Sequence, residues 1–123
     1  MIRAWLAIAA IGGFLSVAAG AVAAHLDAGD RVATLLRTGA LYGMVHAAVL
    51  IAVAAMAAAR HRLGYPLIAA GWGFAAGMIL FSFSLFGLAL TGIEWLGLAT
   101  PFGGTGLLVG WAALGVCAFQ RRS

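Results

Sequence analysis

The stretch AWLAIAAIGGFLSVAAGAVAA, residues 4–24, carries no charge and is long enough to cross a lipid bilayer as one helix. A helix rises about 1.5 Å per residue, so about 20 residues span a hydrocarbon core of about 30 Å. Three more uncharged, mainly apolar stretches follow at residues 39–59, 66–90 and 101–119. Lipid offers no partner to an unpaired backbone group, so each stretch is expected to be helical. The sequence therefore predicts an all-α integral membrane four-helix bundle.

The composition agrees with a membrane protein. Of the 123 residues, 65% are hydrophobic and only 8% are charged, whereas soluble domains carry about a quarter charged residues. A soluble helical bundle with an alanine-rich core is disfavoured, because the apolar stretches are too long and too continuous. The four predicted spans use the whole length, which indicates a single membrane domain over residues 1–123.

The first stretch has a second reading as a secretory signal. Arg3 precedes the apolar run, and Ala21-Val22-Ala23 resembles a cleavage site. The run is longer than the apolar core of a usual signal peptide. We therefore expect the segment to be retained as the first span.

The charged residues predict the orientation. Seven arginines and no lysines stand against Asp27, Asp30 and Glu94, for a formal net charge of +4. The arginines lie at the ends of the apolar stretches rather than on one face, which favours lipid-headgroup contacts over nucleic-acid binding. Five fall on one side of the predicted bundle and two on the other, so both termini are expected in the cytoplasm. The five are Arg3, Arg60, Arg62, Arg121 and Arg122, and the two are Arg31 and Arg37.

The longer outer loop, residues 25–38, contains a helical pattern of its own. Val32, Leu35 and Leu36 follow Asp30, a plausible N-cap, at amphipathic spacing. This pattern predicts a short amphipathic helix lying at the outer membrane interface.

Small residues recur at helix-packing spacing. Such stripes let helix backbones approach closely in membranes. They indicate either a compact bundle or a surface for a homo-oligomer or a larger partner. The predicted packing positions are Gly12, Ser16, Gly20 and Ala24 in the first span, Gly73 and Gly77 in the third, and Gly106 and Gly110 in the fourth.

The fourth span begins in an unusual way. Thr100 is a plausible N-cap and Pro101 suits the first helical position. Gly103 and Gly104 leave the first turn bare, so its N–H groups could bind an anion or a carbonyl oxygen. Close packing against a neighbouring helix is the favoured interpretation.

Few residues in the spans could carry chemistry, and we expect them in the outer half of the bundle. They form either a structural hydrogen-bonded cluster or a site for a quinone, a lipid headgroup or a metal. Haem held by His25 and His46 is disfavoured because the two residues lie at different depths, and no cofactor is expected. The candidate cluster consists of His25, Tyr42, His46, Ser82, Ser84, Thr100, Gly103, Gly104 and Thr105.

No complete catalytic set is present in the sequence. It contains no nucleophile elbow, paired carboxylates, Walker loop or HExxH motif. The spans also lack the charged residues that ion and proton transporters commonly use. Cys117 is the only cysteine and is expected to fill space. The chain is therefore not expected to be an enzyme.

Four stretches resemble a known family: GAVAAH at residues 20–25, YGMVH at 42–46, LFSFSL at 80–85 and TPFGGTGLLVGW at 100–111. The family is the small four-span bacterial membrane family catalogued as domain of unknown function 423, related to eukaryotic transmembrane protein 256. This chain departs from the family at Ala23, Phe83 and Phe86. The resemblance implies an inner-membrane location and no agreed activity. It would carry typical family residues onto Gly20, His25, Tyr42, His46, Ser82, Ser84, Thr100, Pro101, Gly103, Gly104 and Gly110.

The sequence thus favours a non-enzymatic accessory or scaffold protein that contacts membrane lipids or a larger membrane complex. A ligand- or cofactor-binding protein with a site in the outer half is the main alternative. A channel or transporter formed by an oligomer is the second.

Overall fold

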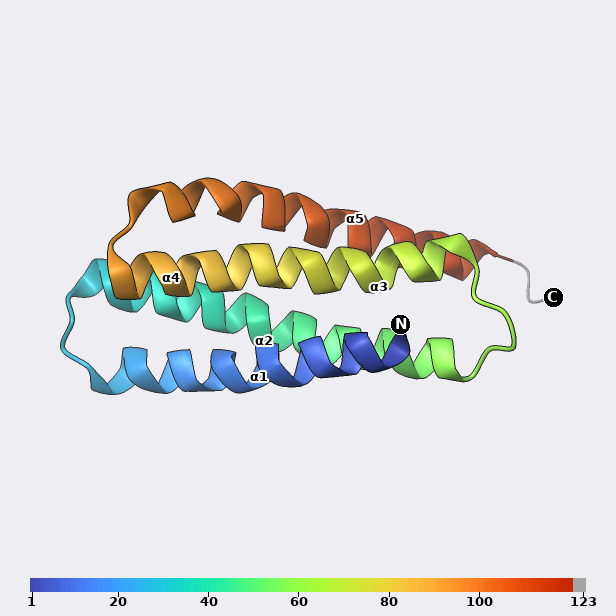
Figure 1. The fold of residues 1–123 in the computed structure, drawn as a ribbon, viewed down its shortest axis with the longest axis horizontal. Coiled ribbons are helices and arrows are strands. Elements are labelled where there is room, and N and C mark those ends of the chain that lie inside the picture. Colours follow the sequence, from blue (N-terminus) through green and yellow to red (C-terminus); the bar gives the residue numbers. More distant parts are fainter. Residues whose placement is uncertain (121–123) are drawn as a thin grey trace.

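Four long antiparallel helices make up the computed structural model, which describes residues 1–120 (Figure 1). The third span is continuous from Tyr65 to Thr91 and the fourth runs from Glu94 to Phe119, and all four spans are long and apolar enough to cross a membrane. The predicted all-α fold with four long apolar helices is confirmed. The elements are α1 (Ile2–His25), α2 (Asp30–Ala58), α3 (Tyr65–Met78), the π-helix η1 (Ile79–Phe83), α4 (Ser84–Thr91), the 3₁₀ helix η2 (Glu94–Leu98) and α5 (Ala99–Phe119).

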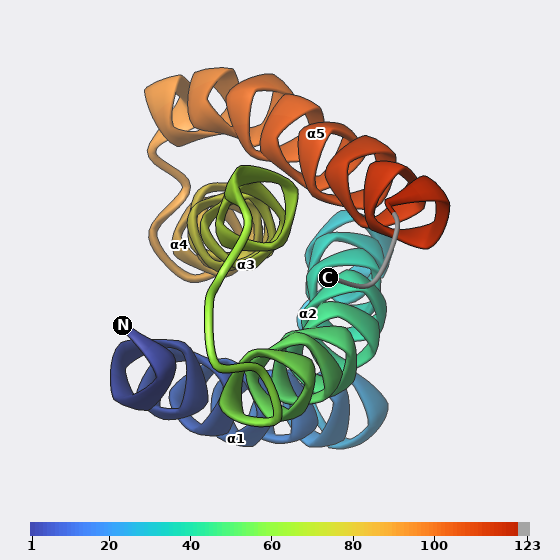
Figure 2. The ribbon, with the colours of Figure 1, turned by 90° about the vertical axis from the view of Figure 1, so that its right-hand side faces the viewer.

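The helices form two hairpins that meet at α2 and α3. Helix α1 packs mainly on α2, and α5 packs mainly on α3. Figure 2 shows α3 and α4 nearly along their axis, with α5 on one side and α2 and α1 on the other. The third span is therefore the central helix, and α1 and α5 leave most of their surface exposed.

The two ends of the bundle differ in charge. Figure 1 shows the start of α1 and the α2–α3 connection toward one end of the bundle, and the α1–α2 connection, the start of α2 and the connection after α4 at the other. The first end, called here the basic end, therefore includes Arg3, Arg60 and Arg62. The opposite end, the acidic end, includes Asp27, Asp30, Arg31, Arg37 and Glu94. The N-terminus and the end of α5 point toward the basic end, on opposite sides of the bundle (Figures 1 and 2). Arg121 and Arg122, on which the predicted cytoplasmic orientation of the termini also rests, lie outside the described residues.

The contact surface of α1 alternates steps of four and three residues. Residues spaced strictly four apart rotate by about 40° per step around a helix of 3.6 residues per turn. After a few steps such a stripe therefore no longer faces the neighbouring helix. Of the predicted stripe, Gly12 and Ser16 are buried, Gly20 is half-buried and Ala24 is exposed. The buried positions are Trp5, Ala9, Gly12, Ser16, Ala19 and Ala23.

The contact between α3 and α5 brings two backbones together. A Cβ atom added to Gly73 would lie 2.9 Å from the backbone nitrogen of Gly110 and 3.0 Å from the carbonyl oxygen of Gly106. One added to Gly77 would lie 2.6 Å from the backbone nitrogen of Leu107. Gly103 lies in the same way against the backbone of Phe81 in η1. Any side chain at these positions would push the helices apart.

The second span differs from the sequence-based expectation at its start. Residues 30–38 are helical, but they form the first turns of α2, so a separate interfacial helix is not confirmed. Nothing between Asp30 and Gly39 breaks the helix, and Leu36 is buried against the bundle. Gly29, with φ 91°, is the cap residue, and Asp30 is the first helical residue. At 29 residues the helix exceeds a bilayer core of about 30 Å, so its first turns extend toward the headgroups.

The fourth span also begins earlier than expected. Helix η2 leads directly into α5, which starts at Ala99 after the cap residue Leu98. The prediction that Thr100 caps this helix is therefore wrong. Its hydroxyl bonds to Ser84 on the neighbouring span instead.

The outer surface explains why the chain belongs in lipid. Large apolar side chains point outward on every span, among them Phe14 on α1, Ile51 on α2, Leu80 on η1 and Leu108 on α5. Soluble monomeric proteins rarely expose a continuous apolar surface of this extent.

The glycines on α5 provide a matched test of the backbone contact. We expect Gly103→Ala to lower the free energy of unfolding by about 1–3 kcal/mol, because its methyl group meets backbone. Gly115 lies on the same helix with nothing within 4 Å of an added Cβ, so Gly115→Ala should leave stability unchanged or slightly higher. The measurement is unfolding of the purified protein by sodium dodecyl sulfate in mild detergent. Equal effects of the two substitutions would contradict a close backbone contact at Gly103.

Candidate functional site

His46 makes two hydrogen bonds that define its protonation state. Its Nδ1 lies 2.7 Å from the carbonyl oxygen of Tyr42, which can only accept, so Nδ1 must carry the hydrogen. The indole N–H of Trp111 lies 3.1 Å from Nε2 and can only donate, so Nε2 must accept. The geometry assigns the neutral Nδ1–H tautomer, and both ring nitrogens are engaged.

Aromatic rings surround this histidine. Tyr42 stacks on it with ring centroids 6.0 Å apart and planes 7° apart. Phe74 lies 5.9 Å from the imidazole, and Trp111 meets it edge-on at 6.0 Å. Phe81 contacts Tyr42 at 4.6 Å. Together these five residues form an aromatic cluster that joins α2, α3, η1 and α5, and His46 is only 5% exposed within it.

The depth of His46 differs from the sequence-based expectation. The sequence predicts an outer-half position for His46 if its helix begins near Gly39. Since α2 begins at Asp30 and ends at Ala58, His46 lies close to the middle of the helix.

The serines form a second polar group, nearer the acidic end. Ser82 donates a hydrogen bond of 2.8 Å to the carbonyl oxygen of Gly39 and so links η1 to α2. Ser84 donates to the carbonyl oxygen of Phe81 at 2.9 Å, which uses its only hydrogen. The hydroxyl of Thr100 must therefore be the donor in the 2.7 Å bond to Ser84. These bonds tie the third span to its neighbours on both sides.

The remaining candidate residues do not join either group. Thr105 donates to the carbonyl oxygen of Pro101 on its own helix at 2.9 Å. His25 is exposed at the end of α1. Gly103 and Gly104 both face Phe81, Gly103 at its backbone and Gly104 at its ring. The nine predicted residues thus divide into several separate contacts rather than one site.

Trp111 is the member of the site that sequence reasoning missed. It stands at the end of the stretch TPFGGTGLLVGW, whose other residues indicate the family resemblance and helix packing. A buried indole N–H usually finds an acceptor, so a tryptophan within a span is a signal for a polar partner, although Trp5 has none among the described residues.

The site is poorly suited to metal binding. Among residues 1–120, no group of three or more histidine, cysteine, aspartate or glutamate side chains could hold an ion. A metal at His46 would have to displace either the carbonyl of Tyr42 or the indole of Trp111.

Two buried polar atoms have no hydrogen-bond partner among the described residues. They are Nε1 of Trp5 and Oγ of Ser16. Ser16 presses directly on Gly43, whose missing side chain makes room for the hydroxyl. Ser16 is thus a close-packing residue between α1 and α2.

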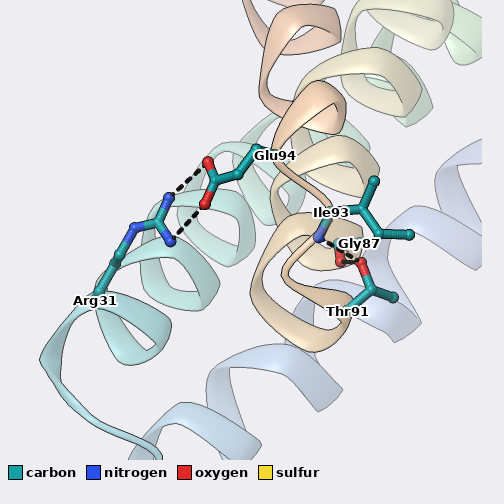
Figure 3. A network of polar contacts seen from close by, with 5 residues as sticks. All are labelled: Arg31, Gly87, Thr91, Ile93 and Glu94. Atoms are coloured by element: carbon teal, nitrogen blue, oxygen red, sulfur yellow. Dashed lines mark hydrogen bonds and ion pairs between the residues drawn. The ribbon is translucent and has the colours of Figure 1, made fainter.

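The acidic end has polar contacts of its own (Figure 3). Arg31 at the start of α2 forms a two-pronged ion pair with Glu94 of η2, with both N–O distances 3.1 Å. Thr91 donates to the carbonyl oxygen of Gly87 and accepts from the N–H of Ile93. Both partners of the ion pair are well exposed, so its contribution to stability is small.

Comparison with known proteins gives a consistent family. The family described as "Protein of unknown function (DUF423)" matches residues 19–104. The "UPF0382 membrane protein YwdK" of Bacillus subtilis is 36% identical, over 96% of this chain and 98% of its own. A "UPF0382 membrane protein" of Haemophilus influenzae is 36% identical, over 97% and 96%. The "UPF0382 inner membrane protein YgdD" of Escherichia coli is 34% identical, over 98% and 92%. No solved structure matches the chain.

The bond between His46 and Trp111 can be tested with a double-mutant cycle. We expect Trp111→Phe and His46→Leu to couple by about 0.6–2 kcal/mol, the range for hydrogen bonds between membrane helices. The measurement is the free energy of unfolding in sodium dodecyl sulfate for the wild type, both single variants and the double variant. Strictly additive effects would mean that the bond contributes nothing.

Proposed function

Because the chain belongs to the DUF423 family of membrane proteins, we propose that it is a non-enzymatic accessory protein that binds a larger membrane complex. One observation carries this proposal: the buried serines of the third span, Thr100 and His46 bond to other groups of the same chain, whereas Ser16 and Trp5 face close helix packing rather than a cavity. Ser82, Ser84, Thr100 and His46 each have a partner at 3.1 Å or less. Groups engaged in this way hold helices together rather than contact a substrate.

The chemistry of His46 supports a structural role over a ligand-binding one. A ligand that accepted from Nδ1 or donated to Nε2 would have to replace an existing bond inside the membrane. Displacement of Trp111 would leave its indole N–H without this acceptor in the membrane, which is costly, and displacement of the Tyr42 carbonyl would break the 2.7 Å bond at Nδ1. A quinone or metal site at this histidine is therefore less well supported.

The exposed face of α5 is a suitable surface for a partner helix. Ala112, Gly115 and Ala118 are exposed there, and an added Cβ at Gly115 would meet nothing within 4 Å. The other spans use small residues for close contact within the bundle. Small residues that face outward could serve the same purpose for a second protein.

We also propose that the basic end faces the cytoplasm, with both termini inside. Arg3, Arg60 and Arg62 lie at that end, and the sequence adds Arg121 and Arg122 after α5. The acidic end carries two arginines, one of which is paired with Glu94. The excess of arginine at the basic end supports this orientation.

Single cysteines test the orientation. Cys117 is buried, so a Cys117→Ala background can carry Ala28→Cys at the acidic end or His61→Cys at the basic end, both exposed positions. In cells with a permeabilised outer membrane and an intact inner membrane, a membrane-impermeant maleimide should label Ala28→Cys but not His61→Cys. Lysis should then expose His61→Cys. The reverse pattern would contradict the proposed orientation.

The accessory role is tested by releasing the protein from native membrane with a styrene–maleic acid copolymer and identifying what leaves with it by mass spectrometry. We expect a protein partner in defined stoichiometry, which Gly115→Leu should reduce because the added side chain blocks a close helix approach. Ala10→Leu, at an exposed position on α1, is the control and should retain the partner. A wild-type protein released alone and as a monomer would count against the proposal.

A further inference from the structure

A cavity of about 200 Å³ opens at the acidic end, between the last turns of α1, the first turns of α2 and the end of α4. Its walls carry only alanine, valine and leucine side chains. Val22 and Leu26 come from α1 and the residue after it, Ala33 and Leu36 from α2, and Ala89 and Leu90 from α4. None of the polar candidate residues of the bundle lines it.

The chemistry of the walls decides what can fill the cavity. The lining side chains are all aliphatic, so polar contacts to an occupant can come only from the backbone groups that form the rest of the wall. An empty space of this size would leave the wall atoms without contacts on one side. The occupant that suits these walls is therefore an apolar group.

The cavity is continuous with the surface that faces lipid. Leu26 and Leu90 line it and are also 59% and 68% exposed. They connect its mouth to the outward-facing apolar side chains of the spans. An acyl chain can thus enter from the bilayer without crossing polar surface.

The position of the cavity matches the upper part of an acyl chain. It lies next to Asp27, Asp30 and the Arg31–Glu94 ion pair, where the apolar spans give way to charged connections. Figure 3 shows this pair bridging the start of α2 and the connection that follows α4. The pair links α2, which forms part of the walls, to η2, which follows α4 in the chain.

We propose that one acyl chain of a bilayer phospholipid occupies this cavity and is recognised by shape rather than by headgroup. The small volume and the aliphatic walls accommodate a single chain segment. This inference rests on the membrane location of the protein and is independent of its proposed partner.

Cavity-filling substitutions provide the first test. The protein is purified in mild detergent with palmitoyl-oleoyl phosphatidylethanolamine or phosphatidylglycerol, and the bound lipid is counted by native mass spectrometry. We expect one retained lipid with either headgroup, and a fall of about tenfold or more in the bound fraction for Ala33→Phe and Ala89→Phe, because the chain loses its buried apolar contact. Ala52→Phe, on the exposed surface of α2, should bind as the wild type does. Undiminished binding in the filled variants, or binding to one headgroup only, would overturn the proposal.

A second measurement needs no substitution in the cavity. Leu36 and Leu88 are both buried leucines near the acidic end, and only Leu36 lines the cavity. In nanodiscs that contain phosphatidylcholine with a nitroxide near the top of one acyl chain, the methyl signals of Leu36 should broaden more than those of Leu88. Equal broadening would show that no chain enters the cavity.

Discussion

Apolar side chains gain little when they leave lipid for the interior of a membrane protein, so the hydrophobic effect does not hold these four helices together. The bundle depends instead on close backbone contact, above all between α3 and α5. There Gly73 and Gly77 face Gly106 and Gly110, and the two helices approach as closely as their main chains permit. This contact places the third span at the centre, and the other helices are arranged around it.

Hydrogen bonds complete the assembly at two depths. Near the middle, His46 joins α2 to α5 through Trp111, and the bond assigns its tautomer. Closer to the acidic end, Ser82 bonds to α2 and Ser84 bonds to Thr100. In each case a polar group that would be costly in lipid is paired with a group on another span. The π-helix η1 takes part directly, since Ser82 lies within it and Gly103 packs against its backbone.

The two ends of the bundle are built differently. At the acidic end the extended first turns of α2, the end of α1 and the end of α4 enclose an aliphatic cavity beneath charged connections. The middle is closely packed around Phe74, Met78 and Leu50. The interior of the bundle thus holds the helices together. The proposed partner and lipid sites both lie on surfaces that face the bilayer.

The sequence by itself determined the number and helical nature of the spans, because an uncharged stretch of about 20 residues has no other stable structure in lipid. It also identified Gly12, Ser16 and the glycine pairs of the third and fourth spans as small positions, though not the drift that leaves Ala24 exposed. It predicted a separate interfacial helix after Asp30, because the polar and charged residues of 30–38 interrupt the apolar run, and it could not show that this helix continues into the second span.

Only the tertiary structure decided which polar groups meet. The partner of His46 is Trp111, 65 residues away in the chain, and helix spacing in one sequence says nothing about which faces of two helices oppose each other. Thr100 bonds across to Ser84 rather than capping its own helix for the same reason. Rotation and relative depth of the helices are set by packing between them, and no local pattern encodes these quantities.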